Sequence, residues 1–102
     1  MPHGNSHENE NPHHLYEIKD AFEGEVYKYG ISDDAIGADG LSARLRDQLS
    51  LFNLVANFLR FVGHILVRDI PGRKEAERIE EEYIQQHVKE YGKRPRGNRE
   101  RR

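Results

Sequence analysis

One carboxylate in this sequence occupies a position where a charged side chain is energetically costly. Residues 73–91 carry apolar side chains at three- and four-residue spacing, the pattern of an amphipathic helix. The apolar face of this helix is formed by Ala76, Ile79, Tyr83 and Ile84. Glu80 falls in the middle of that face, where a carboxylate must be paired or bound to a metal to be tolerated. We therefore expect Glu80 to lie at the edge of a cleft, in an ion pair, or in a metal site.

Other side chains capable of chemistry lie on nearby predicted elements. His87 shares the helical face of Glu80, and a single histidine there is typical of a hydrogen-bonded core residue. Tyr27 and Tyr29 alternate with Lys28 on a short predicted strand, so the lysine and the tyrosines face opposite sides of the sheet. Sheet packing is the expected role of at least one of these tyrosines.

Cysteine is absent, which excludes disulfides, a thiol nucleophile and thiolate metal sites. Arg44 flanks the apolar stripe of an earlier predicted helix, where an arginine also extends to solvent without any function. Four histidines near the start are possible metal ligands, but they lack the regular spacing of ligands on an ordered element. They are His3, His7, His13 and His14.

The chain of 102 residues is long enough for one domain, with 35% hydrophobic and 33% charged residues. No apolar run has the length of a transmembrane helix, so we expect no membrane association. Residues 1–40 carry nine acidic and two basic side chains, whereas residues 89–102 carry seven basic and two acidic ones. Such a basic tail is typical of a phosphate-binding arm or of a solvated tail.

The pattern of residues predicts an α/β (α+β) fold with a small three-stranded sheet flanked by helices. The expected order is β-β-α-(α)-β-α. We predict strands at 14–20, 26–32 and 62–70, one or two helices within 41–59, and a helix at 73–91. Residues 1–13 have the composition of a polar linker, residues 14–98 form the domain, and residues 99–102 form a basic tail.

Five short motifs occur in order along the predicted domain. They are His14-Leu15-Tyr16, Tyr27-Lys28-Tyr29-Gly30-Ile31-Ser32, Arg44-Leu45-Arg46-Asp47-Gln48, Ala76 with Glu80 and Tyr83-Ile84, and Pro95-Arg96-Gly97-Asn98. In this order they resemble the GIY-YIG (URI-fold) nuclease superfamily, and most closely the URI-fold toxin domains of bacterial polymorphic toxins. The resemblance covers residues 14–98, which would then form a URI-like nuclease domain.

The chain departs from the family pattern at three positions. His14 stands where the first motif has glycine, Lys28 where the family usually has tyrosine, and Gln48 where many relatives have histidine. These departures favour the toxin-like branch over the DNA-repair branch. They leave four candidates for the general base, namely Tyr16, Tyr27, Tyr29 and Lys28.

The resemblance implies a metal-dependent endonuclease that hydrolyses DNA phosphodiester bonds. This chemistry needs a water molecule, a base, a metal ion and a cation near the developing charge. By resemblance, Glu80 would hold Mg²⁺ or Mn²⁺, and Tyr16 would position or deprotonate the water with help from Lys28. Arg44 would stabilise the charge on the phosphate, and Asn98 would brace the site or contact the substrate backbone.

The resemblance also implies partners. DNA phosphates would contact the basic segment through Lys93, Arg94, Arg96 and Arg99, without reading the base sequence. A toxin domain of this kind would be the C-terminal part of a larger secreted protein. It would be delivered by a bacterial secretion system, act in the target-cell cytoplasm during interbacterial competition, and be neutralised by an acidic cognate immunity protein.

Three other interpretations remain open on the sequence alone. The first is an RNase toxin on the same fold, because phosphodiester chemistry is alike for both nucleic acids. The second is a non-catalytic nucleic-acid-binding module, in which Glu80 and Arg44 form a structural ion pair. The third is a small interaction domain whose basic tail serves only solubility.

Overall fold

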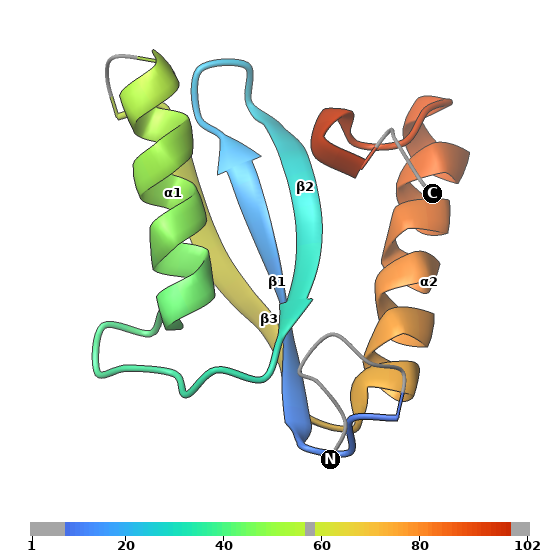
Figure 1. The fold of residues 1–102 in the computed structure, drawn as a ribbon. Coiled ribbons are helices and arrows are strands. Elements are labelled where there is room, and N and C mark those ends of the chain that lie inside the picture. The colour runs from blue at the N-terminus through green and yellow to red at the C-terminus, as the bar shows by residue number, and fades with distance from the viewer. Residues whose placement is uncertain (1–7, 57–58, 99–102) are drawn as a thin grey trace.

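Three strands form one antiparallel sheet, with one helix on each face (Figure 1). A computed structural model describes residues 8–56 and 59–98. The elements are β1 (Pro12–Asp20), β2 (Glu25–Ser32), α1 (Ala43–Ala56), β3 (Phe61–Pro71), α2 (Arg73–Tyr91) and a short 3₁₀ helix, η1 (Arg96–Asn98). The strand order is β2-β1-β3, so β1 is central and β2 is an edge strand. The predicted α+β fold with a three-stranded sheet is confirmed.

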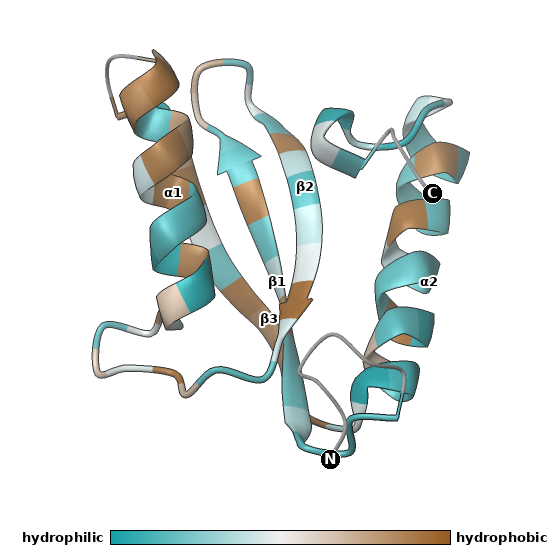
Figure 2. Cartoon of the chain, viewed as in Figure 1, coloured by the Kyte–Doolittle hydropathy of each residue, from teal (hydrophilic) through white to brown (hydrophobic). Residues whose placement is uncertain are grey.

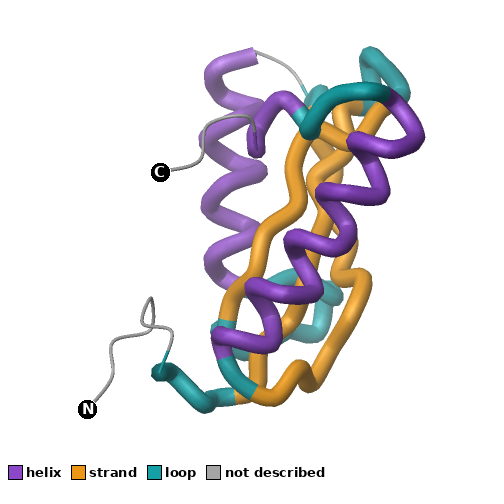
Figure 3. The backbone as a smooth tube through the Cα atoms, turned by 90° about the vertical axis from the view of Figure 1, so that its right-hand side faces the viewer, coloured by secondary structure: helices purple, strands orange, loops and turns teal. Residues whose placement is uncertain are grey.

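The sheet lies between the two helices, as Figure 3 shows from the side, and it separates two small cores. Alternate residues of β1 face opposite helices, because side chains alternate across a strand. Leu15 packs with Ala76 and its neighbours under α2, whereas Tyr16 and Ile18 pack with Leu45 under α1. Leu15, Tyr16 and Leu45 are fully buried. Each helix is therefore held against the central strand by its own apolar contacts.

Asp20 organises the tight turn between β1 and β2. Its Oδ1 accepts hydrogen bonds from the backbone N–H groups of Phe22 (3.0 Å) and Glu23 (3.1 Å). Gly24 closes the turn with a positive φ of 72°, which glycine adopts without steric cost. The same carboxylate pairs with Arg60 and Arg96, at 2.7 and 2.6 Å from Oδ2. A single buried side chain thus joins the hairpin to the start of β3 and to η1.

The start of the first strand differs from the sequence-based expectation. Strand β1 begins at Pro12, and residues 8–11, assigned by composition to a polar linker, contact the domain. Asn9 is buried, its carbonyl accepts the N–H of Arg73 (2.7 Å), and its amide donates to Asp33 (3.0 Å). A single helix, α1, occupies the region where one or two helices were expected. Polar side chains that hydrogen-bond to the fold are indistinguishable by composition from those of a linker.

Figure 2 shows by colour that the second half of α1 is largely hydrophobic. Leu51, Leu54 and Val55 are exposed there. No helix in the described ranges combines the length and the apolarity that a membrane span requires.

Candidate active site

The Tyr16 side chain lies across the neighbouring strand β2. Tyr16 pairs with Gly30 in the β1–β2 register and is fully buried. A Cβ atom added at Gly30 would lie only 2.3 Å from both Cζ and Oη of Tyr16. The phenol ring therefore occupies the space of the missing side chain, and the absence of a Cβ brings its hydroxyl group over the edge strand.

Gln48 of α1 meets this hydroxyl group. The Tyr16 O–H donates to Gln48 Oε1 at 3.1 Å, and the Lys28 ammonium group donates to the same oxygen at 3.4 Å. Lys28 lies on β2 opposite Ile18, which places it on the α1 side of the sheet together with Tyr16. Side chains from β1, β2 and α1 thus converge on one oxygen atom.

Arg44 lies one helical turn before Gln48 and adds positive charge to this cluster. Its side chain acts to lower the pKa of the Tyr16 hydroxyl through a hydrogen bond and through its charge. The same charge also acts to lower the pKa of Lys28. The backbone N–H of Arg44 donates to Asp34 (2.8 Å) near the start of α1. Because Arg44 is exposed, the cluster has a positively charged border with solvent.

Glu80 approaches the cluster from α2. It is buried, with 8% of its surface exposed, on the same helical face as Ala76 and Ile84. Its negative charge acts to raise the pKa of both Tyr16 and Lys28, although these two residues lie on the α1 side of the sheet. The site thus combines residues from both helices beside the edge strand β2.

The pKa values of two groups in this cluster are shifted by their surroundings. Burial raises the pKa of the Tyr16 hydroxyl, whereas Arg44 and Gln48 act to lower it. Burial and the positive charge of Arg44 lower the pKa of Lys28, against the opposing effect of Glu80. The phenol is therefore held neutral at pH 7, while loss of a proton from Lys28 becomes easier than for an exposed lysine.

The carboxylate of Glu80 fits a divalent cation that takes most of its ligands from outside the protein. Among residues 8–56 and 59–98, no group of three or more histidine, aspartate or glutamate residues is placed to hold a metal ion. Mg²⁺ is commonly bound by one or two carboxylates, with water and substrate phosphate completing the shell. Glu80 fits that mode of binding, and the described residues do not fit an ion enclosed by protein ligands alone.

One comparison with known protein families found a match. The model of a family described as URI fold toxin 2 matches residues 6–92. This chain belongs to the URI fold toxin 2 family. No curated protein and no solved structure matches the chain.

Asn98 lies beside the toxin domain's edge strand β2, where it braces the backbone. Its Oδ1 accepts the N–H of Tyr29 (2.7 Å), and its Nδ2 donates to the carbonyl of Tyr29 (2.9 Å). These two bonds occupy backbone groups that a neighbouring strand would otherwise pair with. Asn98 thus fixes β2 next to Lys28 and Gly30.

The basic segment of the toxin domain makes mostly internal contacts. Arg94 bonds to Glu81 (3.2 Å) and to the carbonyl of Asn98 (2.8 Å). Arg96 bonds to Asp20 and lies over the Tyr27 ring. Lys93 is exposed, and Arg99 lies outside the described residues. The arginines at 94 and 96 therefore hold the segment against β2 and α2.

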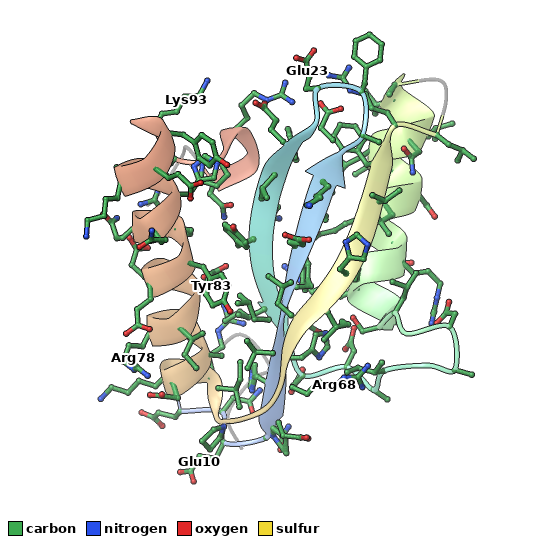
Figure 4. The ribbon with its side chains drawn as sticks, turned by 180° about the vertical axis from the view of Figure 1, so that it is seen from behind. Glu10, Glu23, Arg68, Arg78, Tyr83 and Lys93 are labelled. Atoms are coloured by element: carbon green, nitrogen blue, oxygen red, sulfur yellow. The ribbon has the colours of Figure 1, made fainter. Side chains whose placement is uncertain are left out.

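The two other tyrosine candidates lie away from the Tyr16 hydroxyl. Tyr27 packs edge-on against Phe52 and Phe61, with ring centroids 5.4 and 5.1 Å away. Tyr29 faces α2 and packs against Tyr83 (5.5 Å), which points from α2 toward the sheet in Figure 4. Both serve packing, which leaves Tyr16 and Lys28 in the polar cluster.

The histidines of the toxin domain also have structural partners. His14, which replaces the family's glycine, is buried and bonds to Ser42 Oγ (3.0 Å) at the start of α1. His87 bonds to the carbonyl of Lys93 (2.8 Å), as expected of a core histidine. His13 bonds to the carbonyl of Asn11 (2.6 Å), and His3 and His7 lie outside the described residues.

Two residues with central roles were absent from the predicted site. The spacing of four residues between Arg44 and Gln48 placed both on one face of α1, but it gave no sign that Gln48 contacts Lys28. The two arginine partners of Asp20 are 40 and 76 residues away along the chain. Such distant partners leave no local pattern.

Proposed function

We propose that this toxin domain is a metal-dependent endonuclease that hydrolyses phosphodiester bonds in DNA. The observation that carries the proposal is that Tyr16 and Lys28 meet at Gln48 beside the edge strand, while the charges of Arg44 and Glu80 act on both groups. A phenol, a lysine with a lowered pKa, an exposed guanidinium group and a buried carboxylate are the groups that such a hydrolysis uses. Membership of a toxin family with the URI fold supports the same conclusion.

In the proposed reaction, a water oxygen attacks phosphorus as the bond from phosphorus to the leaving oxygen breaks. The Tyr16 hydroxyl orients the water, and Lys28 in its neutral form accepts the proton that the water loses. Arg44 stabilises the negative charge that develops on the phosphate oxygens. A Mg²⁺ or Mn²⁺ ion held by Glu80 would supply further positive charge to the phosphate when bound. The leaving oxygen takes a proton from solvent.

A toxin domain that cleaves DNA requires delivery and control. We propose that the domain is the C-terminal part of a secreted protein, delivered into the cytoplasm of a competing bacterium. An acidic immunity protein that covers Arg44 and its neighbours would protect the producing cell. Lys93 and Arg99 are the proposed contacts to DNA phosphates at the basic end of the domain. Arg94 and Arg96 would support that segment through their internal bonds.

The decisive experiment compares the wild type with Glu80→Gln on supercoiled plasmid and on total RNA, each with Mg²⁺ and with EDTA. Glu90→Gln, at an exposed position of the same helix, is the matched control. We expect Mg²⁺-dependent plasmid cleavage by the wild type and the control, and none by Glu80→Gln. Cleavage of RNA alone would make the domain an RNase. Nucleic-acid binding without cleavage by the wild type would instead establish a binding module.

A further inference from the structure

Gln48 contacts both polar side chains that the sheet contributes to the candidate active site. Its Oε1 lies 3.1 Å from the Tyr16 hydroxyl and 3.4 Å from the Lys28 ammonium group. An ammonium group only donates hydrogen bonds, so the oxygen of the amide, rather than its NH₂ group, must face the two side chains. Tyr16 therefore donates its proton to Gln48, and the lone pairs of the phenol oxygen point elsewhere.

Gln48 is half-buried beside the core that lies under α1. It lies on α1 three residues after Leu45, which is fully buried and packs against Tyr16 and Ile18. On the opposite side, the Tyr16 ring lies directly on Gly30. Helix α1 thus presents Gln48 to the Tyr16 hydroxyl, and Gln48 Oε1 accepts the Tyr16 O–H.

We infer that Gln48 is a positioning residue that orients the Tyr16 hydroxyl and the Lys28 ammonium group through one shared acceptor oxygen. This inference rests on the proposed nuclease function. A carboxamide oxygen accepts hydrogen bonds but takes up no proton near neutral pH, unlike the histidine that many relatives have at this position. Gln48 acts through Tyr16 and Lys28 and leaves proton transfer to them.

The first test replaces Gln48 by leucine, which fills a similar space but accepts no hydrogen bond. We expect kcat to fall about 100-fold, the usual cost of small errors in the placement of reacting groups. KM stays near the wild-type value, because Gln48 is assigned no contact with substrate. Gln86→Leu, the same substitution at an exposed position of α2, is the control and keeps the wild-type kcat.

The second test, Gln48→His, separates orientation from mere support of the fold. A neutral imidazole accepts a hydrogen bond, whereas an imidazolium only donates. The variant should therefore recover activity above the imidazole pKa, about 6.5 for an unperturbed histidine, and lose it below that pH. The wild type has one acidic limb, from protonation of Lys28, so the variant should show a second limb and a steeper fall below the imidazole pKa. A side chain that only supports the fold would create no second limb.

A third measurement is independent of cleavage. Titration of the Lys28 side chain by ¹³C NMR should give a lower pKa in Gln48→Leu than in the wild type, because the ammonium group loses an acceptor. An unchanged Lys28 pKa would overturn the shared contact even if the domain cleaves nothing. An inactive wild type contradicts the proposed function. An active wild type with an equally active Gln48→Leu contradicts only the role of Gln48.

Discussion

Replacing Gly30 by alanine should misplace Tyr16 while leaving every other polar group of the site intact. The new Cβ would lie 2.3 Å from Cζ and Oη of Tyr16, whereas ordinary contact begins at 3.4 Å. The phenol ring must therefore move by the difference, about 1.1 Å, or the strands must separate by as much. Such a shift is large enough to break the hydrogen bond from Tyr16 to Gln48, which spans 3.1 Å.

Two opposing effects determine the stability of this variant. Overpacking a tight contact costs about 1–3 kcal/mol. Alanine also restricts the unfolded chain more than glycine does, which stabilises the folded state by about 0.4–1 kcal/mol where the backbone is unstrained. The steric cost is larger, so we expect the free energy of unfolding to fall by about 1–2 kcal/mol. The cleavage rate should fall about 100-fold, because the reacting hydroxyl is displaced by about 1 Å.

Urea denaturation and plasmid cleavage measure these two effects separately. Gly37→Ala is the control, because its Cβ would meet mainly the ends of two exposed side chains, Arg46 and Asp39. In a Tyr16→Ala background the steric conflict is gone, so Gly30→Ala should then stabilise the domain slightly. If Gly30→Ala lowers the free energy of unfolding equally with and without the Tyr16 ring, the loss of stability does not come from contact between the new Cβ and that ring. Wild-type cleavage by Gly30→Ala would refute the reasoning outright.

Three further predictions concern the groups around the site. Asp20→Asn should lower the free energy of unfolding by about 3 kcal/mol, measured in urea, because it leaves two arginines with a weakened buried partner. Hydrogen bonds from Arg60 hold the pKa of Asp20 well below its ordinary value. The wild type should therefore exceed Asp20→Asn in free energy of unfolding by the full amount above about pH 4, and by less as the pH falls further. Asn98→Leu should cost about 1–3 kcal/mol and speed hydrogen exchange at the N–H of Tyr29, which loses its acceptor. Lys28→Met should abolish cleavage yet raise the melting temperature at pH 7, since burial disfavours the lysine charge; a lower melting temperature would contradict this.

The sequence predicted the parts of this fold that depend on local patterns. The residue pattern placed the three strands, and the helical spacing in residues 73–91 placed Glu80 on a buried face, where the structure has it. What the sequence could not supply were contacts between distant segments. The pairing of Tyr16 with Gly30 and the sharing of Gln48 Oε1 depend on strand register and helix position.

The basic segment shows why charge composition alone was a poor guide to contacts. Its arginines suggested a solvated or phosphate-binding arm, yet Arg94 and Arg96 bond to Glu81 and Asp20 in the folded domain. Net charge counts side chains but does not reveal their partners. The acidic residues that pair with these arginines lie in other parts of the chain, and only the fold brings them together.

Asn98 has a consequence for any shortened form of this protein. The residues that match the family end at 92, and a chain cut there would keep Tyr16, Lys28, Arg44, Gln48 and Glu80. It would also lose the side chain that closes the outer edge of β2 at Tyr29 and one of the two arginines on Asp20. An uncovered edge strand pairs readily with strands of other molecules. Such a shortened toxin would retain its chemical groups but acquire a tendency to polymerise through its active edge.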